Sequence, residues 1–429
     1  MATATETPVP PEAGTLGDLI VPRFLRYVRI WTTSDRRVND TPSTPGQWEL
    51  AKVLVQELRD LGLSDVELSE HCYVIARIPA TAGRESVPAV GFMAHLDTAS
   101  DVSGKDVKPV VEKNYSGARI DLAGGLCLDP ETEPDLAAHR GRDLIHSDGT
   151  TLLGADDKAG IAILMTMLEY LDRHPEIPHG PVEIIFTPDE EAGKGLAGIP
   201  LEKIRASACY TLDGGPLGEL EGECFNAYKA DVEFSGKAIH VGTARGILAN
   251  AVAMAASYAC MLPRSESPEA TDGYYGYYCP MDIRGDLENA RLEVFLRDFE
   301  PEGMRRRMEA LEHFARAVES QFPGGTVRVN LQVQYLNMKE KIRQRPEVME
   351  LLREAFVRAG VEARLKPVRG GTDGSRLTEL GIPTPNIFTG GRNYHSRLEW
   401  VSVDEMAAAC RVVIELVRVW VERAWAEQT

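Results

Sequence analysis

Two histidines and several carboxylates stand where short apolar runs of the sequence end. The runs and their polar endings are 87–97 with His95 and Asp97, 181–191 with Asp189, Glu190 and Glu191, 207–215 with Asp213, and 383–391 followed by Tyr394 and His395. Two more carboxylates, Asp156 and Asp157, directly precede the apolar segment 158–174. Imidazole nitrogens and carboxylate oxygens without thiolates are ligands that suit Zn²⁺, with Mn²⁺ or Co²⁺ as substitutes. The pattern therefore predicts a site for divalent cations.

The same residues could hold two ions. Burying imidazoles and carboxylates as bare charges is costly, and divalent cations remove that cost by coordination. If Asp156 bridges, one ion takes His95 and Asp213 while a second takes Glu191 and His395. That arrangement leaves open positions for a shared water molecule. The spacing alone leaves open which member of each adjacent acidic pair binds metal.

One carboxylate is expected to stay off the metal. Successive side chains of an extended backbone diverge, so Glu190 and Glu191 cannot both point into one coordination sphere. The free one can accept a proton from a water molecule whose pKa the ions lower. Asp97, two residues after His95, is predicted to share its strand face and to orient its imidazole.

Each of these residues also has an ordinary structural explanation. Asp156 or Asp157 could simply cap the helix that follows. A lone histidine at a strand end is usually a satisfied core or surface group, and a pair of glutamates is usually a solvated turn. The joint pattern favours a metal site over these separate explanations.

The elements that must position the site are predicted as strands separated by helices. The four apolar runs have the composition of buried strands. Segment 158–174 carries an apolar stripe at helical spacing, and a second amphipathic helix runs from Trp48 to about Gly62. This alternation predicts an α/β fold with a mostly parallel sheet flanked by helices. Ligands bind outside the carboxyl ends of the strands in such sheets, so the polar groups should converge there.

A smaller α+β domain is predicted to be inserted into this fold. Three segments alternate apolar and polar residues as half-covered strands do, and two helical stretches lie among them; the strands begin near 225, 289 and 326, and the helices cover 246–262 and 301–321. Helix 346–360 returns the chain to the α/β domain. We predict a catalytic domain over 16–225 and 339–429, an inserted lid domain over 226–338, and a flexible segment over 1–15.

Composition excludes several classes of protein. The 429 residues include 43% hydrophobic and 26% charged residues and carry a net charge of −18, which disfavours nucleic acid and membrane partners. Seven scattered cysteines without a CxxC pair indicate reduced thiols. With no signal peptide or long apolar run, we expect a cytoplasmic enzyme. A tyrosine cluster at 274–278 is predicted to pack within the insert or at an interface, so a homodimer is allowed.

Six motifs resemble the tripeptide aminopeptidases of the two-zinc, aminoacylase- and carboxypeptidase-like metallopeptidase family. They are HLDTA (95–99), LLGADDKAGIA (152–162), FTPDEEAGKG (186–195), TLDGG (211–215), VRGGTDGS (368–375) and PNIFTGGRNYHSRLEWV (385–401). The likeness covers about residues 20 to 425. It implies a zinc-peptidase-like catalytic domain with a lid, two zinc ions per chain, and release of the N-terminal residue from tripeptides. It also assigns the metal ligands, which are His95, Asp156 (bridging), Glu191, Asp213 and His395.

The resemblance assigns further roles. Glu190 becomes the proton acceptor for a metal-bridging water, and Asp97 the second catalytic carboxylate. His240 matches a lid histidine near the scissile carbonyl, although the usual His-Pro-Gly is here His240-Val241-Gly242. Asn250, Arg297 and Arg369 are placed to hold the peptide, since guanidinium groups suit its terminal carboxylate. For Arg297 the alternative is an ordinary exposed position on a lid strand.

Two rival functions stay open. A carboxypeptidase or an N-acyl deacylase would share the same architecture and the same metal ligands. A protein of another class would bind metal or peptide without catalysis. The presence of Glu190 together with all five candidate ligands favours the short-peptide hydrolase.

Overall fold

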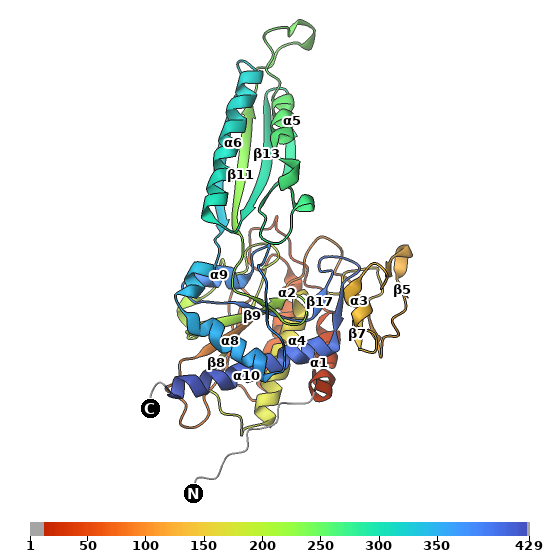
Figure 1. Ribbon diagram of the computed structural model, residues 1–429, viewed down its shortest axis with the longest axis vertical. Helices are drawn as coiled ribbons and strands as arrows, with labels where there is room; N and C mark the ends of the chain where they lie inside the picture. The colour runs from red at the N-terminus through yellow and green to blue at the C-terminus, as the bar shows by residue number, and fades with distance from the viewer. Residues whose placement is uncertain (1–12, 427–429) are drawn as a thin grey trace. The chain divides into compact units, whose positions relative to one another are not determined.

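The structure, a computed structural model, describes residues 13–426 and forms two compact units (Figure 1). The first unit contains the described residues up to 222, then 341–366 and 372–426, and the second contains 223–340 and 367–371. Each unit has its own apolar core. The short stretch 367–371, which carries Arg369, therefore groups with the second unit and not with the first-unit segments that surround it in sequence.

The first unit is built on a mixed sheet of eight strands. Their spatial order is β1-β2-β8-β3-β9-β16-β10-β15. The central neighbours β8, β3, β9 and β16 run parallel, and antiparallel pairs occur toward both edges. The strands are β1 (Asp65–Leu68), β2 (Val74–Ile78), β3 (Val90–His95), β8 (Val182–Thr187), β9 (Ala208–Gly214), β10 (Glu219–Glu221), β15 (Arg364–Leu365) and β16 (Asn386–Phe388). Every residue of β3 and β8 is buried, as their continuous apolar runs predict.

Five helices share the main core with this sheet. They are α1 (Ala13–Tyr27), α2 (Pro45–Asp60), α4 (Ala155–Arg173), α8 (Pro346–Arg358) and α10 (Val403–Ala426). A smaller cluster around Met93, Ile185 and Leu377 includes one residue of the short helix α9 (Asp373–Glu379). The first unit also contains α3 (Pro134–Ala138), and α7 (Lys339–Arg343) begins in the second unit and ends in the first.

Helix α4 closely approaches strand β9, and a glycine permits this approach. A Cβ atom on Gly160 would lie 2.1 Å from the carbonyl oxygen of Leu212. Only glycine fits there, because any side chain would overlap that backbone. The close approach brings the first turn of α4, with Asp156, next to the end of β9, with Asp213.

Two smaller sheets in the first unit were not predicted from the sequence. Strands β4 (Pro109–Glu112), β7 (Leu144–Ser147), β17 (Gly391–Arg392) and β18 (Trp400–Ser402) form an antiparallel sheet in the order β17-β18-β7-β4, and β5 (Ile120–Asp121) pairs with β6 (Cys127–Leu128). Strands of two to four residues carry too few alternating positions to show a pattern.

The second unit is a four-stranded antiparallel sheet with two helices packed on it (Figure 1). The strands lie in the order β12 (Tyr277–Gly285), β13 (Asn289–Asp298), β11 (Asn226–Ser235) and β14 (Thr326–Tyr335). Helices α5 (Ala251–Met261) and α6 (Pro301–Gln321) bury the inward residues of the sheet, among them Val232 and Leu292. Strand β12 was not predicted, and it contains two of the clustered tyrosines.

The predicted fold class is confirmed, with one correction near the N-terminus. Residues 13–15 begin helix α1 and are not part of a flexible segment, while 1–12 lie outside the described residues. Within 13–426, no helix is both long enough and apolar enough to cross a membrane.

Candidate metal centre

The central parallel strands bring the predicted polar groups to one edge of the sheet. In the pairing of β3 with β8, His95 lies opposite Thr187, so the segment with Glu190 and Glu191 begins just beyond it. On the other side β3 pairs with β9, which carries Asp213 near its end. The expected convergence at the carboxyl ends of the strands is present.

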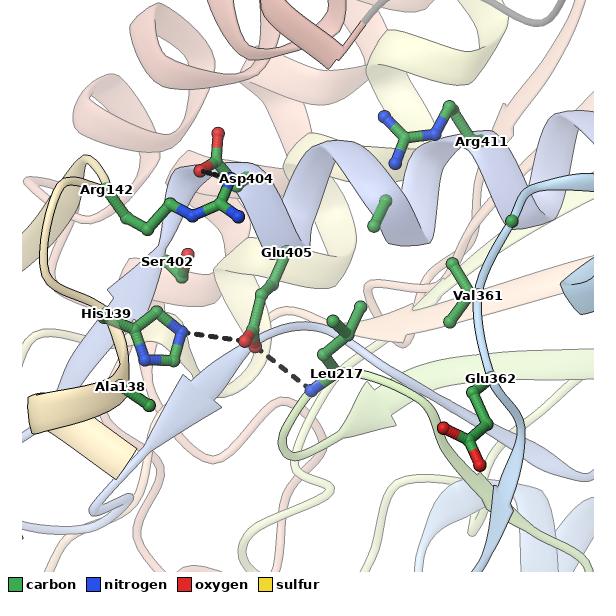
Figure 2. Close-up of a pocket in the computed structure, with 12 residues that line it drawn as sticks. Ala138, His139, Arg142, Leu217, Val361, Glu362, Ser402, Asp404, Glu405 and Arg411 are labelled. Carbon is green, nitrogen blue, oxygen red and sulfur yellow. Dashed lines mark hydrogen bonds and ion pairs between the residues drawn. The ribbon is translucent and has the colours of Figure 1, made fainter. Parts of the chain in front are cut away.

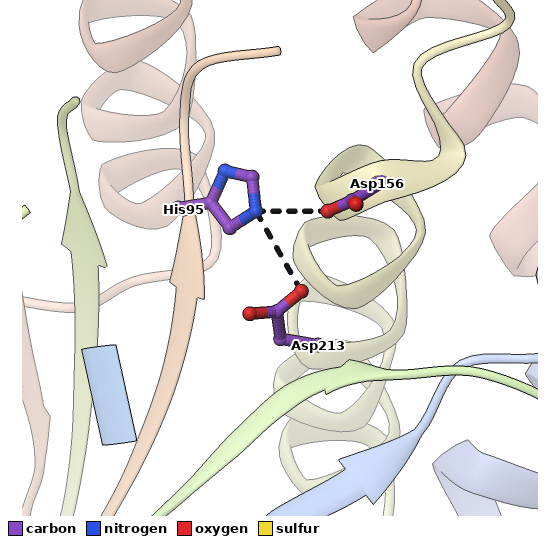
Figure 3. A group of neighbouring side chains, drawn as sticks. All are labelled: His95, Asp156 and Asp213. Carbon is purple, nitrogen blue, oxygen red and sulfur yellow. Dashed lines mark hydrogen bonds and ion pairs between the residues drawn. The ribbon is translucent and has the colours of Figure 1, made fainter. Parts of the chain in front are cut away.

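Three of the residues form a first group around the imidazole of His95 (Figure 3). Its Nε2 atom lies 2.9 Å from Asp156 Oδ1 and 3.6 Å from Asp213 Oδ1. The side chain of His95 is 2% exposed, and those of Asp156 and Asp213 are 13% and 12% exposed. One nitrogen and two carboxylate oxygens therefore face one small space.

A second group joins Asp156 to Glu191 and His395. The Nε2 atom of His395 lies 2.9 Å from Glu191 Oε1 and 3.4 Å from Asp156 Oδ2. His395 has a φ of 59°, a left-handed conformation that turns its ring toward this group. Its side chain is 41% exposed, so this group is the more open one.

The two groups share Asp156, one oxygen each. Oδ1 faces His95 and Oδ2 faces His395, which is the arrangement of a carboxylate that bridges two cations. Glu191 Oε1 is buried, and its close contact with His395 Nε2 turns it into the second group. The donor set and its two-part geometry fit a pair of divalent cations.

Burial and close contact shift the pKa values of these groups in a way that cations would relieve. Burial raises the pKa of Asp213 to about 6 and that of Glu191 to about 7, and the neighbouring Asp156 adds to both. Burial opposes the charge on His395, but hydrogen bonds to Asp156 and Glu191 outweigh it and raise its pKa to about 11. Bound cations would keep the carboxylates ionised and the imidazoles neutral, as coordination requires.

Asp97 and Glu190 lie beside the two groups. Asp97 is fully buried, and its two carboxylate oxygens accept the backbone N–H groups of Glu190 and Glu191 at 3.0 and 3.1 Å. Its Oδ1 also lies 3.4 Å from His95 Nδ1. The prediction that Asp97 shares a strand face with His95 is wrong, because β3 ends at His95. The contact arises from the loop. Burial raises the pKa of Glu190 well above its usual value.

Asp157 takes a different part from its neighbour Asp156. Its carboxylate accepts the backbone N–H of His95 at 3.1 Å and that of Gly160 at 3.2 Å. It therefore ties the end of β3 to the first turn of α4 and belongs to neither of the two candidate ligand groups. This geometry favours Asp156 as the metal-binding member of the pair.

Sequence reasoning missed Glu399. This residue is 1% exposed, and its carboxylate accepts the four consecutive backbone N–H groups of residues 153–156 at 2.7 to 3.2 Å. It therefore holds the segment that ends in Asp156. Its position four residues after His395, inside the last of the six motifs, was the available signal.

Asp373 was also missed. It is 6% exposed and has one oxygen without a hydrogen-bond partner in the described chain. Together with His95, Thr187 and Asp213 it lines a small cavity of about 10 Å³. Burial raises its pKa to about 7. Its place within the motif VRGGTDGS was the available signal, but the prediction selected Arg369 of the same motif instead.

The four residues predicted to hold the peptide all belong to the second unit. His240 is exposed, and its Nδ1 accepts the N–H of Gly242. Asn250 caps helix α5 by accepting the N–H of Ala253. These contacts leave the other nitrogen of His240 and the amide NH₂ of Asn250 available to a ligand.

The two arginines of that set are engaged within the second unit. Arg297 is 7% exposed, lies over the rings of Phe295 and Tyr335, and donates to backbone carbonyls, so the alternative of an exposed strand position is wrong. Arg369 lies over the Phe225 ring and donates to the carbonyls of Thr271, Gly273 and Tyr275.

Comparison with known proteins places the chain in a family. The family model for Peptidase family M20/M25/M40 matches residues 135–419, and the chain belongs to this peptidase family. It is 45% identical to Peptidase T of Clostridium perfringens over 401 residues, which are 94% of this chain and 98% of that protein. The resemblance to tripeptide aminopeptidases drawn from the six motifs is confirmed.

Solved structures show the same fold. A tripeptidase from Staphylococcus aureus superposes with a TM-score of 0.76 at 21% identity, covering 95% of this chain and 99% of that chain. A Bacillus subtilis protein described as a dinuclear metal binding peptidase from the M20 family superposes with a TM-score of 0.63 at 14% identity, with coverage of 95% and 99%. At these identities the likeness concerns the fold.

Proposed function

We propose that the protein removes the N-terminal residue from tripeptides with the help of two zinc ions. His95 and Asp213 would hold one ion, Glu191 and His395 the other, and Asp156 would bridge them. The observation that carries the proposal is the orientation of Asp156, whose two oxygens face the two histidines separately. The similarity to Peptidase T supports the substrate class, and the dinuclear metal peptidase of the same fold supports two ions.

Zinc fits the donor set best. Two imidazole nitrogens and three carboxylates without thiolate suit Zn²⁺, and Mn²⁺ or Co²⁺ are the expected substitutes. When bound, such a pair of ions activates water at neutral pH and polarises a peptide carbonyl.

The protein's own residues supply the proton transfers. Glu190 is the base that takes the proton of the attacking water and later gives it to the leaving amine. Asp97 fixes Glu190 by accepting its backbone N–H and also lies against the His95 ring.

The second unit is proposed to recognise the peptide. His240 would support the developing oxyanion, and Asn250 would bind the peptide backbone. Arg297 and Arg369 would bind its terminal carboxylate, although Arg369 must then exchange at least one of its carbonyl partners for the ligand.

The setting of the reaction is part of the proposal. All seven cysteines are free in the structure, which supports the cytoplasm as the compartment. The net charge of −18 supports short peptides over nucleic acid as the ligand.

The base assignment is tested with Glu190→Gln. The glutamine keeps the shape of the side chain but cannot take a proton, so we expect turnover to fall by about 10²–10⁴-fold with metal content unchanged. Tripeptide hydrolysis and metal per chain are measured on the same preparation, with wild type as the reference. Full activity in the variant contradicts the assignment.

The substrate class is tested by blocking the amino end. A free tripeptide should be cleaved and its N-acetylated form should not, with release of the N-terminal residue followed by mass spectrometry. Preference for the blocked peptide would favour the rival functions, a carboxypeptidase or an N-acyl deacylase. Absence of any chelator-sensitive cleavage would favour a binding protein.

A further inference from the structure

A second cavity lies in the first unit and contains none of the candidate metal ligands (Figure 2). It has a volume of about 420 Å³, which falls within the range of about 300–1,000 Å³ typical of small-molecule sites. Four parts of the chain line it: the segment after α3 with His139 and Arg142, the segment after β9 with Leu217, the segment after α8 with Val361 and Glu362, and the start of α10. Nothing in the proposed reaction uses it.

Most of the charged groups around the cavity are already paired with one another. His139 Nε2 lies 2.8 Å from Glu405 Oε1, and Arg142 Nη1 lies 2.9 Å from Asp404 Oδ2. Glu405 also accepts the backbone N–H of Leu217 at 3.0 Å and pairs with Arg392. These contacts fix the shape of one side of the cavity and leave no charge there for a ligand.

Two charged groups of opposite sign remain. Arg411 and Glu362 both line the cavity, Arg411 partly buried and Glu362 exposed, and neither side chain has a hydrogen-bond or ion-pair partner within residues 13–426. Burial lowers the pKa of Arg411 from its usual value, because its half-buried guanidinium loses hydration that the charge of the nearby Asp404 offsets only in part. Figure 2 draws Val361 between the two side chains.

The surface between these two charges is apolar. Leu217, Val361 and Ala408 line the cavity together with the bare backbone of Gly360. A cation, an anion and an apolar wall in one small cavity match a molecule that carries a carboxylate, an ammonium group and an aliphatic side chain.

We propose that this cavity binds an aliphatic amino acid or a short dipeptide as a zwitterion, with its carboxylate on Arg411 and its ammonium group on Glu362. The binding site stands apart from the metal centre and does not depend on the proposed function. If that function is correct, both ligands are products of the reaction, so the protein would hold its own products at a second place.

The test compares ligands that lack one charge with variants that lack the matching partner. L-leucine and glycyl-leucine are titrated into the full-length protein by calorimetry, together with leucinamide, which lacks the carboxylate, and N-acetyl-leucine, which lacks the ammonium group. The variants are Arg411→Gln and Glu362→Gln, and Arg59→Gln on the exposed end of α2 is the matched control. Thermal unfolding verifies that each variant is folded.

We expect Arg411→Gln to weaken binding of L-leucine by about tenfold, because a hydrogen-bonded charge pair is lost. The variant should then bind L-leucine no more tightly than leucinamide, which has no carboxylate. Glu362→Gln should in the same way remove the advantage over N-acetyl-leucine, and Arg59→Gln should change nothing. The tighter of L-leucine and glycyl-leucine identifies the ligand. Unchanged binding in Arg411→Gln would place the ligand at the metal centre instead and overturn the proposal, as would no binding of either ligand at about 10 mM. Neither outcome bears on tripeptide cleavage, so the two proposals fail separately.

Discussion

The two halves of the candidate metal centre are built differently. His95 and Asp213 stand at the ends of neighbouring parallel strands, and the side chain of His95 is 2% exposed. Glu191 and His395 stand on loops, and the side chain of His395 is 41% exposed. The first half is supported by the sheet, whereas the second depends on loop backbone, including a left-handed residue at His395.

This difference suggests that the two halves have different roles. A half supported by buried strands keeps its geometry with or without a ligand, while an open half gives access to water and substrate. Asp156 belongs to both halves, so changes at Asp156 should affect the whole centre and changes elsewhere should affect one half.

The largest effect is expected from Asp156→Asn. The amide keeps the size of the side chain but lacks the charge needed to bridge two cations. We expect fewer than two ions per chain and a fall in tripeptide turnover of about 10³-fold or more. Elemental analysis and initial rates check this prediction. Two tightly held ions with near-normal turnover would show that Asp156 does not bridge.

Two single substitutions, one in each half of the centre, compare the two halves. His95→Ala and His395→Ala should each lose about one ion and about 10²–10³-fold in turnover. Added imidazole should restore part of the activity of His395→Ala, because that position is open to solvent, and none of the activity of His95→Ala, because that position is buried. Equal rescue of both variants would remove the distinction drawn between the halves.

Glu399→Gln tests how Asp156 is held. A glutamine oxygen can replace only one of the two carboxylate oxygens, so two of the four N–H groups of 153–156 lose their acceptor. We expect metal affinity to fall by about 10–100-fold. Competition with a chelator measures it, and Glu70→Gln at an exposed position serves as the control. Unchanged affinity would mean that the segment holds its shape without Glu399.

The smallest effect is expected at Glu221, a buried carboxylate of the eight-stranded sheet that faces no candidate ligand. Burial and the nearby Glu219 raise the pKa of Glu221 to about 8. Because the folded value exceeds the unfolded one, the stabilisation from its proton is present below about pH 4.5 and is lost as the pH rises to about 8. Glu221→Gln should therefore gain about 4 kcal/mol over wild type by pH 8 and only about 1 kcal/mol at pH 5.

Urea unfolding at the two pH values measures that gain. The hydrogen bond from Asn386 can persist in the variant, because glutamine also offers an oxygen. A stability difference that does not change with pH would contradict the raised pKa of Glu221.

The sequence predicts the sheet-supported half of the site better than the loop half. His95 and Asp213 end long buried apolar runs, and such runs indicate strands whose carboxyl ends meet. The family and the fold class also follow from motifs and alternation, and the comparisons confirm them. The same rule places His395 less directly, since it stands several residues after the run 383–391 and follows a strand of two residues.

Other features depend on contacts that sequence spacing does not reveal. Glu399 accepts N–H groups from residues about 245 positions away in the chain, and nothing local marks it as an acceptor. Asp157 differs from Asp156 only in the direction of its side chain at the start of α4, and the sequence does not reveal that direction. The engaged state of Arg369 depends on the segment 271–275, whose carbonyls it binds.

Anomalous diffraction from crystals of the protein loaded with zinc tests the central claim most directly. We predict two zinc peaks per chain, one between His95 and Asp213 and one between Glu191 and His395, with Asp156 in contact with both. A single peak, or two peaks with Asp156 bound to only one of them, would contradict the proposed dinuclear centre.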